Sequence, residues 1–208
     1  FASMLANDFE VDEIMVNSAM TKLQNSADQY TRYTARMELK KTLVAPRIKL
    51  LTQFNALPDG VKFLVDMRAE LVSLKSNETS IQGLEYDLKE ILTSWFDVDF
   101  LELRRITWDS ASAALLEKLI AYEAVHAIDG WDDLKNRLDS DRRCFAYFHP
   151  RMPDEPLIFV EVALVNGLEG NIQNLLDESA PVLDPHNADT AIFYSISNAQ
   201  KGLAGISF

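Results

Sequence analysis

Apolar residues recur at helical spacing through most of the first 140 residues. From Leu84 to Phe96, six apolar side chains recur at i, i+4, i+7, i+8, i+11 and i+12, so they share one helix face. A second stripe runs from Val61 to Val72, and Asp109 can cap a helix that continues to Ile120. Weaker helical stretches are predicted at 11–23, 33–43, 46–54 and 131–138. The pattern predicts an all-α bundle.

The period changes after Arg142. Runs rich in aromatic and β-branched residues predict strands at 143–148, 157–165 and 190–196. Asn171 can cap a short helix before the third strand. That strand is apolar almost throughout, which favours a buried, central position in a sheet. The order of elements predicts the first strands of an α/β layer.

Composition changes at the same place. Four of the seven glycines and five of the seven prolines follow Arg143, and only two basic residues, Arg151 and Lys201, lie beyond it. We therefore predict two domains, 1–141 and 142–208. The fold class expected is multidomain, an all-α helical bundle followed by an α/β domain.

Net charge limits the partners. A formal charge of −12 argues against binding to nucleic acid or to an anionic membrane surface, because both need a positive field. No apolar run is long enough to span a bilayer, and the first thirty residues resemble no targeting peptide. One cysteine, Cys144, suits a reducing compartment, so a cytoplasmic location is expected. Because the chain begins without Met and stops abruptly after Gly-Ile-Ser-Phe, we also expect a piece of a longer protein.

Most of the candidate chemistry has an ordinary structural interpretation. His126, His149 and His186 have no second His or Cys at ligand spacing, so no metal site is predicted. Cys144 lies inside a predicted strand and is expected to be a buried, inert thiol. The acidic pair Asp132-Asp133 is expected on a solvated face.

The turn after the third strand carries the strongest chemical signal. It holds Gly202 and Gly205, with Gln200, Lys201 and Ser207 as polar neighbours. Backbone N–H groups at such a turn, opening a helix, can bind phosphate. A plain connection between elements is the alternative interpretation, and the one this signal alone favours.

Several separated stretches resemble malonyl-CoA decarboxylases, in the right order along nearly the whole chain. They include Phe-Leu-Val-Asp-Met-Arg-Ala at 63–69, Arg-Ile-Thr-Trp at 105–108, Tyr-Glu-Ala-Val-His at 122–126, Trp-Asp-Asp-Leu-Lys at 131–135, Ala-Ile-Phe-Tyr-Ser-Ile-Ser at 191–197 and Gln-Lys-Gly-Leu-Ala-Gly at 200–205. The resemblance implies a helical domain used in self-association, as a dimer or tetramer, followed by a catalytic domain of the GNAT acetyltransferase fold. It also implies conversion of malonyl-CoA to acetyl-CoA and CO2 without metal or organic cofactor.

The same resemblance assigns a substrate-binding loop. It aligns Ala204, Gly205, Ile206, Ser207 and Phe208 with the loop whose amides hold the CoA pyrophosphate. Ala204 stands where the family pattern has Gln or Arg, and Ser207 stands where it has a glycine. The family's Ser and His are expected after position 208, so no catalytic residue is assigned here and the chain alone is expected to be inactive. Neither His149 nor Ser197 is assigned those roles.

Two other functions stay open on the sequence. The chain would serve as a helical assembly scaffold if its α/β part only bound acyl-CoA without catalysis. Alternatively, it would transfer an acetyl group to an amine, the commonest activity of the implied fold.

Overall fold

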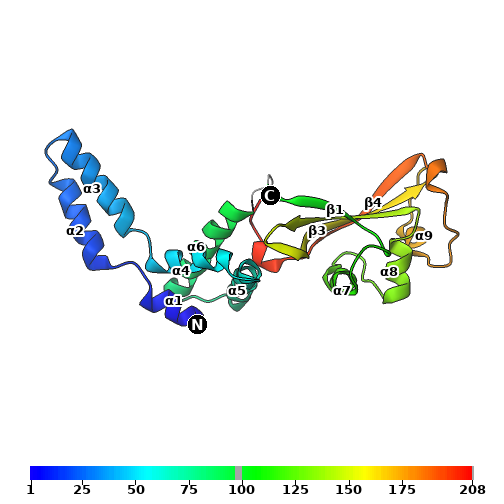
Figure 1. Ribbon diagram of the computed structural model, residues 1–208, viewed down its shortest axis with the longest axis horizontal. Helices are drawn as coiled ribbons and strands as arrows, with labels where there is room; N and C mark the ends of the chain where they lie inside the picture. Colours follow the sequence, from blue (N-terminus) through cyan, green and yellow to red (C-terminus); the bar gives the residue numbers. More distant parts are fainter. Residues whose placement is uncertain (97–99, 208) are drawn as a thin grey trace. The chain divides into compact units, whose positions relative to one another are not determined.

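The structure, a computed structural model, describes residues 1–96 and 100–207. The chain divides into two compact units, Phe1–Trp95 and Phe96–Phe208 (Figure 1). The first unit is helical, and the second is a mixed α/β unit built on a four-stranded sheet. A helical part followed by an α/β part was predicted, and this order is confirmed.

The first unit consists of helices joined by short connections. They are α1 (Ala2–Asp8), α2 (Glu13–Gln24), α3 (Gln29–Thr42), α4 (Pro46–Gln53), η1 (Phe54–Ala56), α5 (Gly60–Leu74) and α6 (Thr79–Trp95). The predicted stripe on α6 is buried at Leu84, Leu88, Ile91 and Leu92. Asp12 and Asp28 accept backbone N–H bonds at the starts of α2 and α3. These caps satisfy amides that a helix start leaves unbonded.

The helices α2 and α3 form a hairpin that packs mainly on itself. Only Val16, Ala19 and Ala35 are buried within it. Several large apolar side chains stay exposed on it: Ile14, Met15, Met20, Tyr30 and Tyr33. The hairpin therefore presents apolar surface that the other helices of its own unit do not cover.

The second unit is organised around an antiparallel sheet in the order β1-β2-β3-β4. The strands are β1 (Glu102–Ile106), β2 (Arg142–His149), β3 (Met152–Val165) and β4 (Thr190–Asn198). The helical elements are α7 (Ala113–Tyr122), α8 (Trp131–Arg137), α9 (Ile172–Leu176), η3 (Pro185–Asn187) and η4 (Lys201–Leu203). Asn171 caps α9 through a bond from Gln173 N–H, as predicted.

The core of this unit lies on the face of the sheet that α7 and α8 cover. Leu116, Leu119 and Leu134 from these helices pack on Phe148 and Phe159 from the strands. On the other side, β4 leaves Phe193 67% and Ile196 62% exposed. One face of the sheet is therefore packed, and the other retains apolar surface.

The structure differs from the sequence prediction at three places in the fold. Strand β1 was not predicted, and it pairs with β2 across the Ile106–Cys144 register. Strand β4 lies at an edge of the described sheet, not in the centre, and its side chains alternate in burial near its end. The helix cap before α7 is Ser112 instead of Asp109.

The predicted domain boundary at 141/142 falls inside the second unit. Strand β1 pairs with β2, and α7 and α8 contribute core residues against the sheet. Residues 102–137 therefore pack with the sheet, and the two compact units divide at Trp95 instead. The composition changes near Arg142, where β2 begins. The core of the second unit begins earlier in the sequence, because it already includes Ile106.

Candidate functional site

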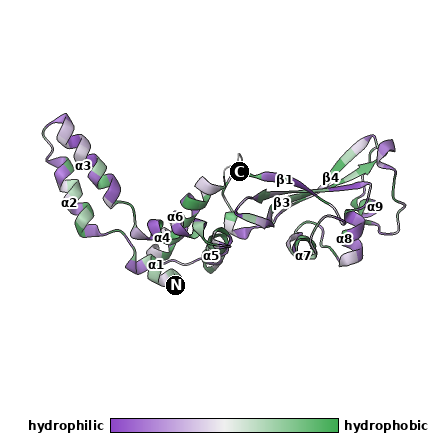
Figure 2. Ribbon diagram, viewed as in Figure 1, coloured by the Kyte–Doolittle hydropathy of each residue, from purple (hydrophilic) through white to green (hydrophobic). Residues whose placement is uncertain are grey.

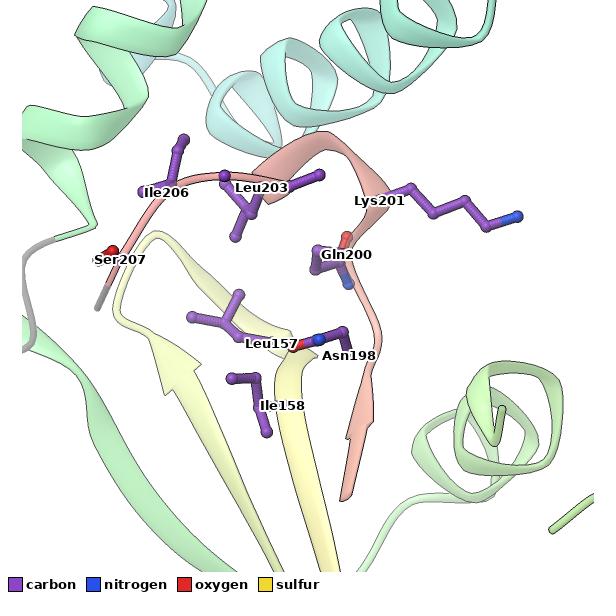
Figure 3. A pocket seen from close by; sticks show the side chains of 10 residues that line it. Leu157, Ile158, Asn198, Gln200, Lys201, Leu203, Ile206 and Ser207 are labelled. Carbon is purple, nitrogen blue, oxygen red and sulfur yellow. The ribbon is translucent and has the colours of Figure 1, made fainter. Parts of the chain in front are cut away.

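A cavity of about 360 Å³ lies at the end of the sheet where β3 starts and β4 finishes (Figure 3). Its walls come from two segments far apart in the sequence. The lining residues are Leu157, Ile158, Asn198, Gln200, Lys201, Leu203, Ala204, Gly205, Ile206 and Ser207. The pairing of β3 with β4, which sets Ile158 opposite Asn198, brings the segments together.

The loop after β4 is shaped by short-range backbone bonds. Leu203 N–H donates to Gln200 O at 3.0 Å, Ala204 N–H to Lys201 O at 3.2 Å, and Ile206 N–H to Leu203 O at 3.0 Å. Gly205 adopts φ 73°, a left-handed conformation that glycine tolerates without steric cost. The loop is thus a sequence of tight turns, and no helix follows it within the described residues.

Two amides of this loop are open to a ligand. Among the described residues, no acceptor bonds the N–H of Gly205 or the N–H of Ser207. Both residues line the cavity. Unbonded backbone N–H groups at a turn are suitable donors to an anionic oxygen such as that of a phosphate. The N–H groups that could bind a phosphate therefore lie at a turn, whereas the sequence analysis expected them at a turn that opens a helix.

The apolar part of the cavity is a small hydrophobic floor. Leu157 is 1% exposed, and Leu203 is 4% exposed. Figure 3 shows Leu157 on the side of Leu203, whereas the Ile158 side chain lies further from the loop. A ligand with both an anionic and an apolar part would match this lining, because it holds both backbone amides and aliphatic side chains.

Lys201 is the one charged side chain among the described residues that line the cavity. Its ammonium group points away from Leu157 and Ile158 (Figure 3), and no ion pair in the described part of the chain involves it. The ammonium group can therefore turn toward an anion at the cavity mouth without breaking an ion pair of the described residues.

Four of the five residues assigned to the substrate loop line the cavity: Ala204, Gly205, Ile206 and Ser207. Phe208 lies outside the described residues. The sequence did not assign Leu157, Ile158 or Asn198 to this site, because their contribution depends on strand pairing. The strand predicted at 157–165 was the one sequence feature that could have indicated Leu157 and Ile158. It did not indicate how this strand pairs with the third predicted strand.

The loop begins with a buried glutamine that ties it to β3. Gln200 is 6% exposed, and its Nε2 donates to Pro156 O at 2.9 Å and to Glu155 Oε2 at 3.4 Å. One residue earlier, Ala199 N–H donates to Leu157 O at 2.9 Å. These bonds fix the first residues of the loop to the first residues of the buried part of β3.

Ser197 and His149, which the sequence analysis did not assign as catalytic residues, both have structural partners. Ser197 is 1% exposed, donates to Glu123 Oε2 at 3.0 Å and accepts from Ala124 N–H at 3.2 Å. His149 is 7% exposed, and its Nδ1 accepts from Arg151 N–H at 3.1 Å. Its ring also lies against Phe96, with centroids 4.7 Å apart. Both side chains are therefore held in contacts that account for their burial.

Cys144 lies inside strand β2, as the sequence predicted. The Cys144 thiol is buried, and burial together with the charges of Glu161 and Glu123 raises its pKa far above the ordinary value. The predicted burial is confirmed, and the raised pKa favours the neutral, less reactive form of the thiol. No group of three or more His, Cys, Asp or Glu suited to a metal is found among residues 1–96 and 100–207.

Known families match both units. Residues 9–96 match the Malonyl-CoA decarboxylase N-terminal domain, and residues 99–208 match the Malonyl-CoA decarboxylase C-terminal domain. "Malonyl-CoA decarboxylase, mitochondrial" of Anser anser anser is 35% identical in an alignment of 212 positions that covers 97% of this chain and 42% of that protein. The protein of the same name from Mus musculus is 32% identical and is covered over 43% of its length.

Solved structures give the same result. The crystal structure of malonyl-CoA decarboxylase from Rhodopseudomonas palustris superposes with a TM-score of 0.90 at 41% identity. That from Agrobacterium vitis superposes with a TM-score of 0.87 at 40% identity. Each match covers 100% of this chain and 49% of the other. The chain thus spans less than half the length of these relatives, and it belongs to the malonyl-CoA decarboxylase family.

Proposed function

We propose that this chain provides the acyl-CoA-binding loop of a malonyl-CoA decarboxylase, a carboxy-lyase that converts malonyl-CoA to acetyl-CoA and CO2. The observation that carries the proposal is the cavity at the end of β3 and β4, lined by Ala204 through Ser207. The N–H groups of Gly205 and Ser207, which bond no acceptor among residues 1–96 and 100–207, suit the diphosphate of CoA. Membership of the family supports malonyl-CoA as the substrate.

The chain's own part of the chemistry is to bind and orient the thioester. Loss of CO2 from a β-carboxy thioester leaves an enolate, whose oxyanion must be stabilised and whose carbon must be protonated. The resemblance places the Ser and His used for these tasks after position 208. The residues described here therefore hold the nucleotide part of the substrate. Ala204, in place of a Gln or Arg, offers the diphosphate no side-chain donor, and its own N–H donates to Lys201 O.

Backbone recognition also reconciles the ligand with the charge of the chain. The formal net charge is −12, yet the proposed ligand is anionic. Amides fixed at a turn act at contact distance, whereas the field of distant surface charges is screened over about 10 Å at moderate ionic strength. Local donors are therefore sufficient for an anion on an acidic protein. No metal or organic cofactor takes part in this proposal.

The helical unit supports a second role, self-association as a dimer or tetramer. The hairpin of α2 and α3 leaves Ile14 82% and Tyr30 75% exposed. Large apolar side chains gathered on one exposed element are typical of an interaction surface. A purely structural scaffold that binds acyl-CoA without catalysis is the alternative, and this surface is the observation in its favour.

No helix among residues 1–96 and 100–207 has the length and apolar character needed to cross a membrane. Among the relatives, those from Anser anser anser and Mus musculus are named as mitochondrial proteins. For this chain we propose a cytoplasmic location, supported by the presence of a single cysteine, which is free and buried.

Calorimetric titration with CoA tests the proposed site. Gly205→Trp fills the cavity and removes the glycine from a left-handed position, so we expect affinity for CoA to fall at least tenfold. The matched control is Gly167→Trp, because Gly167 also has a positive φ, 77°, but has open space around it and lies outside the cavity lining. Equal CoA affinity for the parent chain and Gly205→Trp would remove the loop from CoA binding.

A further inference from the structure

Gln200 joins the cavity loop to a polar cluster behind it. Its Nε2 donates to Glu155 Oε2 and to Pro156 O. Glu155 in turn forms an ion pair with Lys118 at 2.7 Å and accepts a bond from Tyr122 OH at 3.2 Å. Lys118 and Tyr122 belong to α7, so the loop is connected through Glu155 to the helix that covers the sheet.

The backbone bonds inside the loop do not explain its position. The bonds from Leu203 to Gln200 and from Ile206 to Leu203 join residues three apart. Bonds of this kind shape a turn without fixing the turn to the sheet. The Gln200 side chain and the Ala199–Leu157 bond cross from the loop to β3, directly beside the cavity.

The orientation of Gln200 follows from hydrogen-bond chemistry. The carboxylate of Glu155 and the carbonyl of Pro156 are acceptors, so position 200 must supply a donor. A glutamine amide supplies two N–H bonds, whereas a carboxylate supplies none. Replacing the amide by a carboxylate would place two like charges at hydrogen-bond distance in a mostly buried setting, which is costly.

We propose that Gln200 is a positioning residue, which holds the amides of Gly205 and Ser207 where a diphosphate can reach both, and that Glu155 is its fixed partner. The inference rests on the proposed function, because it names the device that sets the geometry of the same loop. Gln200 acts through the loop, and its Nε2 is already committed to Glu155 and Pro156.

The test compares Gln200→Glu with the parent chain at pH 8 and at pH 5.5. Among the described residues, the ionisable side chain bonded to position 200 is Glu155 on β3, which in turn contacts Lys118 and Tyr122 on α7. At pH 8 the new carboxylate repels Glu155, and we expect CoA to bind at least tenfold more weakly than to the parent. At pH 5.5 protonation restores a donor, and we expect binding within threefold of the parent.

Two further variants separate positioning from a merely structural role. Adding Glu155→Gln to Gln200→Glu restores the bond between the two side chains with the roles exchanged, but leaves Pro156 O without the donor that Gln200 supplies. At pH 8 we therefore expect the double variant to bind CoA more tightly than Gln200→Glu alone and more weakly than the parent. The control, Gln173→Glu, makes the same chemical change at an exposed residue of α9 and is expected to bind as the parent does. Equal weakening of Gln200→Glu at both pH values, or no weakening at pH 8, would overturn the inference.

Hydrogen exchange of amides 199–206 gives a readout that needs no ligand. We expect these amides to exchange at least fivefold faster in Gln200→Glu than in the parent at pH 8, after correction for intrinsic rates. If the parent binds no CoA, the proposed function fails, whereas faster exchange in the variant still establishes the anchor. Unchanged exchange overturns the anchor whether or not CoA binds.

Discussion

At the scale of single residues, the most consequential group is a buried arginine on α8. Arg137 is 2% exposed and donates to Asp133 at 2.8 Å, to Glu161 at 3.2 Å and to the carbonyls of His126 and Ala127. The prediction that Asp133 lies on a solvated face was wrong, because the residue is 7% exposed. The spacing of Asp133 and Arg137, i and i+4, was the available signal for their pairing.

Glu161 makes stability depend on pH through this network. Burial raises the pKa of its carboxyl to about 7, and the charge of Glu123 acts in the same direction, against Arg137. Because the folded pKa exceeds the ordinary 4.5, the stabilising contribution of Glu161 is complete below pH 4.5 and is lost as the pH rises through 7. Between pH 5 and 8 we expect the parent to lose up to about 3 kcal/mol of unfolding free energy relative to Glu161→Gln, which does not titrate.

Urea unfolding of both chains at pH 5 and pH 8 measures this difference. Glu117→Gln, at an exposed position of α7, makes the same chemical change without the buried environment. We expect that control to follow the parent within about 0.5 kcal/mol at both pH values. A constant gap between the parent and Glu161→Gln across the range would contradict the assigned titration.

At the scale of elements, periodicity predicted helices better than strands. The stripe on α6 lies buried as its spacing indicated, because one face of a helix must pack against a neighbour. Strand β1 has the sequence Glu-Leu-Arg-Arg-Ile and buries only Ile106, so its hydrophilic ribbon in Figure 2 gives no strand pattern. It is a strand because β2 offers it an edge, and that information lies some forty residues further along the chain.

Strand β4 shows a different limit of sequence patterns, because the strand was predicted but its position in the sheet was not. Its apolar run predicted a central strand, yet Phe193 and Ile196 are largely exposed at the edge of the described sheet. A run of apolar residues indicates side chains that favour burial, but it does not indicate which segment packs against them. The same limit applies to the site, where the loop was predicted and its partners Leu157 and Ile158 were not.

The α2–α3 hairpin carries the prediction that belongs to this scale. Ile14→Asp replaces an exposed apolar side chain by a charge in the first turn of α2, where the helix dipole tolerates an acid. If the hairpin mediates self-association, the variant should dissociate at least tenfold more readily in sedimentation experiments. Ser18→Asp, at an exposed polar position on α2, is the matched control for charge. Unchanged sedimentation of Ile14→Asp would exclude this surface from assembly.

At the scale of the whole molecule, the chain joins a helical unit to a sheet unit that carries the loop. The order of the two units followed from the change of period, whereas their division did not. Residues 102–137 look helical or polar in sequence, yet β1, α7 and α8 complete the core around the sheet. Tertiary pairing therefore decides the boundary, and the local pattern does not record it.

The division of labour in the proposed reaction gives the last prediction. Residues 1–208 contain the loop that would hold the CoA diphosphate, whereas the resemblance places the Ser and His of the reaction after position 208. We therefore expect this chain to bind CoA yet release no CO2 from malonyl-CoA above the uncatalysed background, in an assay that traps labelled CO2. The Rhodopseudomonas palustris relative, assayed alongside, is the positive control. EDTA should leave CoA binding unchanged, because the proposed contacts are backbone amides. Turnover by residues 1–208 would show that this chain holds its own acid–base groups, and those would then have to be sought among its described residues.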